Sequence, residues 1–446
     1  MNGEIAIVRS PRIPRHLLVA ASAWASRVVT ALVLLASVRI LMDSLGLENY
    51  AVFVLLTGLT GWFMLADMGI GVSVQNHISE SRARGQSYDD LISASGLLAV
   101  LLLFVTVIAL YFISPYVAPL LLKNFPFLSE AEKTKLFFLT GALSIGMGVG
   151  GIVYKVWYGE QRGYLSNIVP AIAALVGFVG LLLVRQAPVE DRLFLSLAAF
   201  TAPPAVLPLG VLLVQQLRVR RLRRGLEHSG TKLPGAIQRL MKRGFHFWLF
   251  AIMAAGVLQI DYIVMSQFLA AHDIAAYYIS TKVFGLAFFV YSAILFALWP
   301  VFAESIAKRE WGLVQRYLKK YLALGLAFMF ICTVSLIWLM PVAVGILAPK
   351  ESIIIPLGFV LLLGVYQMIR IWTDTFAMVL QSISNLKPFW IYVPIQAILS
   401  IVLQWMLVPI YGLYGVVLGL IASFVFTVIW ALPMAVWENY KLHQQP

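Results

Sequence analysis

Long runs of apolar residues fill most of this chain, and they constrain its fold more than any other feature of the sequence. As a helix, about 20 apolar residues span the hydrocarbon core of a bilayer. Twelve such runs are present, at 17–41, 49–71, 91–113, 136–157, 166–184, 193–217, 244–268, 275–300, 321–345, 353–381, 388–410 and 413–436. We therefore predict an all-α polytopic membrane protein with about 12 transmembrane helices.

The composition excludes other classes of protein. The chain is 61% hydrophobic and 12% charged, whereas soluble domains have about 45–50% apolar and about 25% charged residues. This difference rules out a soluble enzyme and a disordered chain. The apolar residues form continuous runs and do not alternate with polar ones, which also rules out an outer-membrane barrel.

The basic residues predict the orientation of the helices. With the N-terminus inside, 23 of the 33 Lys and Arg residues fall in inner segments and 7 in outer segments. Cytoplasmic loops of membrane proteins carry such an excess of basic residues. We expect both termini in the cytoplasm, and we read the net charge of +13 as a topology signal and not as a nucleic-acid surface.

A basic segment at 218–243 divides the chain into halves of six predicted spans each. The two halves share identical residues at a shift of 224 positions: Val169-Pro170 matches Val393-Pro394, and Leu183-Val184 matches Leu407-Val408. The alternative is chance similarity between apolar sequences. Repeated halves are typical of transporters, so we predict a lobe at 1–217, a cytoplasmic linker at 218–243 and a lobe at 244–446.

Six charged residues lie within or near the ends of predicted spans, where a charge costs about 3 kcal/mol or more. Such residues usually face a partner or a water-filled cavity. They are Arg27, Asp67, Asp261, Lys282, Arg370 and Asp374.

The tenth predicted span carries the clearest polar stripe. Gln367, Arg370, Asp374 and Gln381 fall on one face of a helix. This face is predicted to point to the protein interior or a cavity, although Arg370 and Asp374 could instead neutralise each other as an i,i+4 pair. Trp372 in the same span could stack on a sugar ring or pack in the core.

The other charged residues leave several interpretations open. Asp261 and Lys282 could form a buried pair, or Asp261 could titrate a proton or ion coupled to transport, as could Asp374. Arg27 has no evident partner and is suited to hold an anion, because a guanidinium binds phosphate with two hydrogen bonds. Asp67 could mark a helix end that has a structural or gating role.

The sequence has no motif for catalysis or for a metal. It lacks His-Glu-x-x-His, Gly-x-Ser-x-Gly and a Walker lysine motif, and its six histidines have no metal-ligand spacing. We predict that the chain is not an enzyme and that it uses no metal or cofactor.

Three stretches resemble the Wzx-type O-antigen flippases of the multidrug/oligosaccharidyl-lipid/polysaccharide exporter superfamily. They are Leu65-Ala-Asp-Met-Gly-Ile-Gly71, Gln259-Ile-Asp-Tyr-Ile-Val-Met-Ser-Gln-Phe-Leu269 and Leu298-Trp-Pro-Val-Phe-Ala-Glu304. The resemblance implies a MATE-like, V-shaped fold of two six-helix lobes. It also implies a flippase of the bacterial inner membrane that moves an undecaprenyl-pyrophosphate-linked oligosaccharide repeat unit to the periplasmic leaflet for O-antigen or exopolysaccharide synthesis.

The resemblance further implies a basic cavity, and Arg27, Lys282 and Arg370 match that role by position. Gln367 and Trp372 are expected beside them. Expected partners are the lipid-linked oligosaccharide, membrane lipid, and the polymerase and chain-length proteins of the same pathway. Two alternatives remain open: an ion-coupled drug exporter of the same fold, and a membrane polysaccharide polymerase or ligase.

Overall fold

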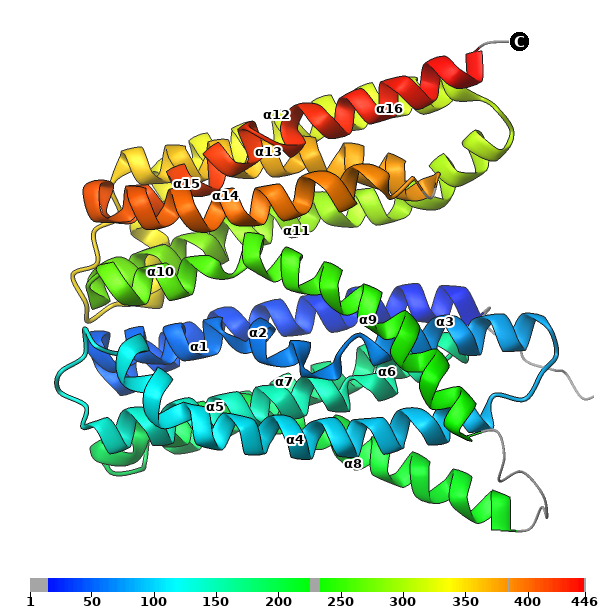
Figure 1. Ribbon diagram of the computed structural model, residues 1–446. Helices are drawn as coiled ribbons and strands as arrows, with labels where there is room; N and C mark the ends of the chain where they lie inside the picture. Colours follow the sequence, from blue (N-terminus) through cyan, green and yellow to red (C-terminus); the bar gives the residue numbers. More distant parts are fainter. Residues whose placement is uncertain (1–14, 225–232, 384, 445–446) are drawn as a thin grey trace, which may run out of the picture.

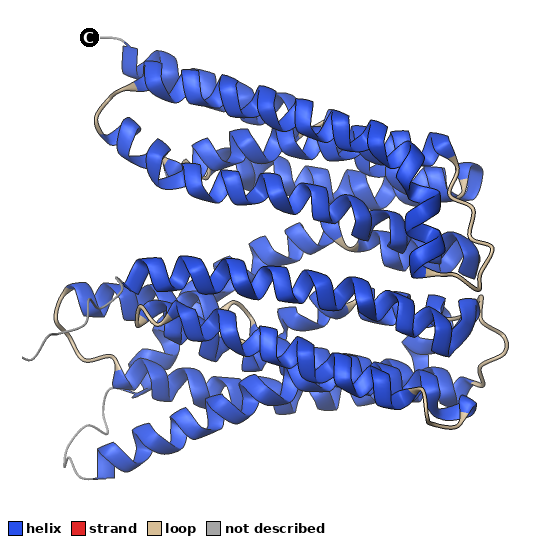
Figure 2. Ribbon diagram, turned by 180° about the vertical axis from the view of Figure 1, so that it is seen from behind, coloured by secondary structure: helices blue, strands red, loops and turns tan. Residues whose placement is uncertain are grey.

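The computed structural model describes residues 15–224, 233–383 and 385–444, and the secondary-structure elements of these ranges are all helical. The helices form two groups, which lie one above the other in Figure 1. The groups approach each other at one end of the molecule and diverge toward the end that carries the C-terminus (Figures 1 and 2). We call these the closed end and the open end.

The first group is built by the N-terminal half of the chain. It comprises α1 (Arg15–Gly58), α2 (Thr60–Met64), η1 (Leu65–Asp67), α3 (Ile70–Ala83), α4 (Asp89–Leu121), α5 (Glu130–Gly150), α6 (Ile152–Gly159), α7 (Gly163–Val184), η2 (Val189–Asp191) and α8 (Arg192–Arg224).

The second group follows from α10 onward, and α9 connects it to the first. These helices are α9 (Leu233–Leu258), α10 (Ile260–Phe268), α11 (Ala271–Ala307), α12 (Trp311–Leu347), α13 (Leu357–Ser382), α14 (Lys387–Tyr411), α15 (Leu413–Val425) and α16 (Val428–Gln444). Because α9 packs on α3 and α4 as well as on α14, it belongs to both groups. The predicted linker 218–243 lies partly in α8 and α9, and its residues 225–232 fall outside the described residues.

Among the described residues, 10 helices are long and apolar enough to cross a membrane, or 11 if α9 and α10 form one bent span. One of these, Ser22–Asp67, has 46 residues. A straight helix of that length would be about 69 Å long, more than twice the roughly 30 Å hydrocarbon core. Gly46, with φ 69° and ψ 175°, interrupts it, and the chain turns back there (Figure 1). The predicted spans 17–41 and 49–71 both lie in this segment.

Burial differs sharply between helices, as a bilayer requires. In the second half of α1, the seven residues from Tyr50 to Leu56 are at most 1% exposed. In α4, by contrast, Phe104 and Phe112 are each 66% exposed and Tyr116 is 76% exposed. Large apolar side chains on an outer face are stable in lipid, so α4 presents a lipid-facing surface while the last turns of α1 belong to the core.

Polar contacts between the two groups gather at the closed end. Asp43 of α1 pairs with Lys350, in the loop between α12 and α13. The Asn124 side-chain amide donates to the Ser266 carbonyl oxygen over 3.1 Å, and the Gln267 amide donates to the Leu120 carbonyl oxygen over 3.0 Å. These contacts hold α1, α4 and the loop after α4 against the second group.

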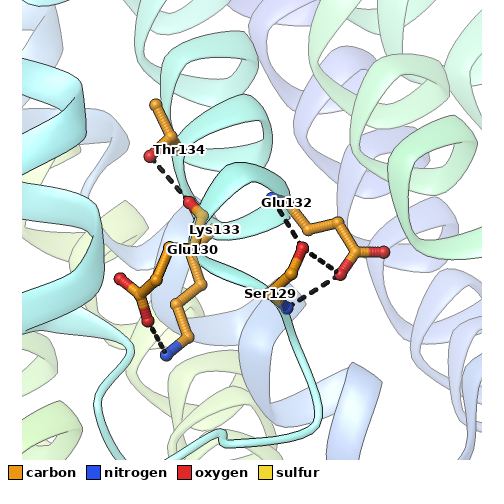
Figure 3. Close-up of polar contacts among 5 residues, drawn as sticks. All are labelled: Ser129, Glu130, Glu132, Lys133 and Thr134. Atoms are coloured by element: carbon orange, nitrogen blue, oxygen red, sulfur yellow. Dashed lines mark hydrogen bonds and ion pairs between the residues drawn. The ribbon is translucent and has the colours of Figure 1, made fainter.

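The loop before α5 ends in a capping box (Figure 3). The Ser129 hydroxyl accepts from the Glu132 backbone N–H, and the Glu132 carboxylate accepts from the Ser129 backbone N–H over 2.8 Å. Lys133 pairs with Glu130 over 3.0 Å. The charged residues of this loop therefore stabilise a helix start, and they do not form the acid–base arrangement that a polymerase or ligase would need.

Helix α9 is held on the first group by a close backbone contact. Gly69 has φ 69°, and a Cβ atom at this position would lie 2.3 Å from the Gly244 carbonyl oxygen. Beside it, Arg243 donates to the Glu80 carboxylate over 2.7 Å. This hydrogen bond lowers the pKa of Glu80. The sequence Gly69-Ile-Gly71 thus serves a helix crossing that only glycine permits.

We predict that Gly69→Ala destabilises the protein by about 2 kcal/mol or more. A non-glycine residue in the left-handed region costs about 1–2 kcal/mol, and the added methyl group would also collide with α9. The thermal unfolding midpoint of the detergent-solubilised protein measures this effect. Gly210→Ala is the control, since nothing lies within 4 Å of its added Cβ atom. Equal midpoints for the two variants would contradict this account of the crossing.

Candidate functional site

Arg27 and Lys282 lie where α1 of the first group faces α11 of the second. The Arg27 guanidinium carbon is 6.0 Å from the centre of the Phe289 ring, and Trp24 meets the same ring edge-on at 5.9 Å. Lys282 Nζ lies 4.7 Å from the Tyr278 ring centre. Because Lys282 and Phe289 are seven residues apart, they share one face of α11.

This face of α11 is the one turned to α1, since the Tyr278 ring also meets Tyr50 of α1 edge-on at 6.1 Å. We call the surface formed by Arg27, Tyr50, Tyr278, Lys282 and Phe289 the seam. The Arg27 side chain is exposed and that of Lys282 is half-buried. The structure therefore brings together two of the three predicted basic residues, one from each group.

Arg370 of α13 lies beside the seam, where α13 packs against α11. Its guanidinium carbon is 4.3 Å from the centre of the Phe288 ring, which neighbours Phe289 in sequence. Arg370 Nη2 is 3.7 Å from Asp374 Oδ2, and the Arg370 side chain also hydrogen-bonds to Tyr366. Of the two interpretations of the polar stripe, the structure shows the neutralising pair. The pair remains accessible to solvent or ligand, because the Arg370 side chain is 26% exposed and that of Asp374 is 40% exposed.

Asp261 is buried at a break between two helices. The chain bends by 40° between α9 and α10 at Gln259, whose carbonyl oxygen accepts from the Trp62 indole N–H over 3.3 Å. Asp261 follows in the first turn of α10, where a carboxylate is favourable. It accepts from the Tyr277 hydroxyl over 2.5 Å and from the Tyr262 backbone N–H over 3.0 Å.

These contacts correct one of the two interpretations of Asp261. Its partners are Tyr277 and Tyr262, and no ion pair joins it to Lys282 among the contacts of the described residues. Lys282 points to the seam, whereas Asp261 lies within the second group. The expected Asp261–Lys282 pair is therefore wrong, and similar depth on neighbouring helices did not bring the side chains together.

Gln367 and Trp372 do not join Arg27 and Lys282. Gln367 is 4% exposed, and its Oε1 atom lacks a hydrogen-bond partner in the described part of the chain. Trp372 donates to the Ile429 carbonyl oxygen over 2.8 Å and lines a groove of about 630 Å³ between α12, α13 and α16. Two residues along a helix face nearly opposite sides, so Trp372 packs away from Arg370.

Asp67 is the last residue of the short helix η1, and its side chain lines a pocket. Its Oδ1 atom accepts from the Gly69 backbone N–H over 2.9 Å. The pocket, of about 410 Å³, is lined by Asp67, Lys155 and Tyr158 together with Phe247 of α9. Lys155 is not among the candidate residues of the sequence analysis, because its place near the end of a predicted span does not reveal what it faces.

No cluster of three or more His, Cys, Asp or Glu side chains suited to a metal ion occurs in residues 15–224, 233–383 and 385–444. The buried Asp261 and the half-buried Asp374 each have partners from the protein itself. The site is an arrangement of cations, aromatic rings and hydroxyl groups.

Comparison with known proteins identifies the family, although no family model matches the chain. The chain is 40% identical to a Yersinia pseudotuberculosis protein named for O-antigen export, over 95% of this chain and 96% of that protein. It is 39% identical to a Salmonella typhi protein named for O-antigen transport, over 97% and 98% of the two chains. The chain belongs to the O-antigen transporter family.

Solved structures show which fold this O-antigen transporter has. It resembles the lipid II flippase MurJ in an inward closed conformation, with a TM-score of 0.67 and 15% identity over 94% of this chain and 87% of MurJ. It also resembles an inward-facing MATE transporter of the MOP superfamily, with a TM-score of 0.61 and 14% identity over 92% and 96%. The predicted MATE-like fold and the Wzx-type resemblance are confirmed.

The family membership also confirms that the O-antigen transporter is not an enzyme, because its relatives are transporters. It is a multi-pass membrane protein, and its spans match the predicted ones in order. The roles of individual residues stay predictions, and the arrangement described above is the basis for proposing them.

We predict that Tyr277→Phe destabilises the O-antigen transporter by about 1–3 kcal/mol, because it leaves a buried carboxylate oxygen without its donor. Tyr278→Phe is the matched control, since the contacts of that residue come from its ring. Thermal unfolding in detergent compares the two variants. A midpoint for Tyr277→Phe as high as that of Tyr278→Phe would show that the Asp261 contact adds nothing to stability.

Proposed function

We propose that this protein flips an undecaprenyl-pyrophosphate-linked oligosaccharide repeat unit from the cytoplasmic to the periplasmic leaflet of the bacterial inner membrane. The observation that carries the proposal is the placement of Arg27 and Lys282 on the seam between the two helix groups. Two cations at that position suit a pyrophosphate anion. Membership of the O-antigen transporter family and the likeness to a lipid II flippase support it.

The orientation follows from the charges. The C-terminus lies at the open end (Figure 1), and the inner segments of the predicted topology hold most of the basic residues. By the positive-inside rule the open end faces the cytoplasm, with both termini in the cytoplasm. The molecule is then inward-facing, and the two groups act as the lobes 1–217 and 244–446.

Transport is proposed to proceed by rocking of these lobes. The pyrophosphate binds Arg27 and Lys282 from the inner leaflet, the sugars occupy the polar space between the lobes, and the lipid tail stays in the bilayer. The closed-end contacts, among them Asp43 with Lys350, then break while the open end closes. A polymerase and chain-length protein would receive the unit on the outer side.

Arg370 and Asp374 are suited to couple binding to the state of the second lobe. In this structure Asp374 partly neutralises Arg370 at 3.7 Å. An anionic substrate that drew Arg370 away would leave the Asp374 carboxylate free to take up a proton or a cation. Asp261 is a second candidate for such coupling, because it is a buried acid in the same lobe.

A drug exporter of the same fold is the competing function. Most of its substrates would be cations, and Arg27 and Lys282 on the seam would repel them. Efflux of a cationic fluorescent dye therefore separates the two functions. Cells that produce the protein should extrude the dye no faster than cells that lack it.

We predict that Arg27→Ala lowers O-antigen export at least tenfold, because a charged hydrogen bond to a buried anion contributes about 1.5–3 kcal/mol. Each variant is expressed in a strain that lacks the gene, and surface O-antigen and lipid-linked intermediates are quantified. Arg27→Lys should retain part of the export, since it keeps the charge but loses the bidentate geometry.

The control for this experiment is Arg84→Ala, at an exposed position beyond α3. It should export at the wild-type level. Full export by Arg27→Ala at an equal amount of membrane protein would remove Arg27 from the proposed site. Normal O-antigen in the deletion strain itself would contradict the flippase function.

A further inference from the structure

The pocket beside Asp67 lies between the first lobe and α9. It has a volume of about 410 Å³, which is within the range of about 300–1,000 Å³ for small-molecule sites. Its polar lining comes from Asp67 of η1, Tyr154, Lys155 and Tyr158 of α6, and Ser166 of α7. Phe247 and Ala251 of α9 close the side that faces the second lobe.

Two polar groups in this pocket are left without a hydrogen bond within the part of the chain that the structure describes. No hydrogen bond or ion pair joins the Lys155 ammonium or the Tyr154 hydroxyl to another residue in the described ranges. The neighbouring groups are fixed, since Ser166 donates to the Tyr154 carbonyl oxygen over 2.9 Å. The pocket thus presents the Tyr154 hydroxyl group and, near the Asp67 carboxylate, the Lys155 ammonium group.

We propose that this pocket binds a sugar ring of the lipid-linked oligosaccharide, with the Tyr154 hydroxyl and Lys155 as hydrogen-bonding groups. This inference rests on the proposed flippase function and adds a second binding site to it. The Asp67 carboxylate in the lining would repel a pyrophosphate, but it accepts hydrogen bonds from sugar hydroxyl groups. The rings of Tyr154, Tyr158 and Phe247 offer apolar surface against which the face of a sugar packs.

The position of the pocket fits a substrate whose pyrophosphate lies at the seam. The Tyr158 hydroxyl donates to Asn167 over 2.9 Å, and Asn167 donates to Ser22 of α1 over 3.1 Å. Arg27 is five residues further along α1, which is about 7.5 Å of helix. A sugar in the pocket would therefore place the attached pyrophosphate toward Arg27.

The test compares two lipid probes for binding to the purified full-length protein. One is the lipid-linked oligosaccharide extracted from cells that lack this protein, and the other is undecaprenyl pyrophosphate without sugar. The wild type should bind the sugar-bearing lipid more tightly. Tyr154→Phe removes only the free hydroxyl group and should reduce this preference about fivefold, the value of one neutral hydrogen bond.

The matched control is Tyr111→Phe, on the lipid-facing side of α4, where the side chain is 63% exposed. It should keep the full preference, and Lys155→Gln should lose it as Tyr154→Phe does. Arg27→Ala should weaken the binding of both lipids by the same factor, because it acts on the shared pyrophosphate. Thermal unfolding shows whether each variant remains folded.

Two results would overturn the proposed sugar site. One is an equal affinity of the wild type for the two lipids, and the other is an unchanged preference in both Tyr154→Phe and Lys155→Gln. Failure of the wild type to bind either lipid would contradict the flippase function itself, and the sugar site with it. The two failures are therefore distinguishable.

Discussion

The hydrocarbon core of the bilayer constrains the backbone and the charged side chains of the whole structure. Because lipid offers no hydrogen bonds, every backbone group within it must find a partner inside the protein, and the chain responds with helices. The exceptions are informative. At the break between α9 and α10, the Trp62 indole N–H donates a hydrogen bond to the Gln259 carbonyl oxygen. At η1, the Asp67 carboxylate accepts a hydrogen bond from the Gly69 backbone N–H. Irregular backbone occurs where other side chains satisfy it, and both breaks lie where the first lobe meets α9 or α10.

The same constraint sorts the charged residues by function. Asp261 accepts hydrogen bonds from Tyr277 and Tyr262, and Arg370 is partly neutralised by Asp374, so these charges have partners within the second lobe. Arg27 and Lys282 instead face aromatic rings on the seam, where a rocking motion of the lobes changes their surroundings. In the proposed mechanism a substrate anion binds these two cations at a surface whose surroundings change as the lobes move.

Much of the fold could be predicted from the sequence, because apolar run length and basic-residue placement carry that information directly. The unusual charges of the spans were also visible in the sequence, and the structure places Arg27 and Lys282 on the seam, whereas their role in binding stays a prediction. Side-chain partners could not be predicted. Asp261 and Lys282 have similar depth, but Asp261 meets Tyr277 of α11, and Lys282, five residues further along that helix, lies on a different face. Trp372 is two residues from Arg370, and this small offset places it on the opposite face. The role of Lys155 could not be predicted from the sequence either, because the pocket that it lines also needs residues of α9, which lie far from it along the chain.

The central claim is that the lobes must separate at the closed end for transport to occur, and cross-linking that end tests it most directly. Asp43→Cys and Lys350→Cys, made in a Cys332→Ser background, place one thiol on each lobe where the two side chains now pair. A short reducible cross-linker should stop O-antigen export, and a reductant should restore it. Cysteines at Glu130 and Lys133, within one helix, serve as the control and should leave export unchanged. Undiminished export by fully cross-linked Asp43→Cys/Lys350→Cys protein would contradict the rocking account.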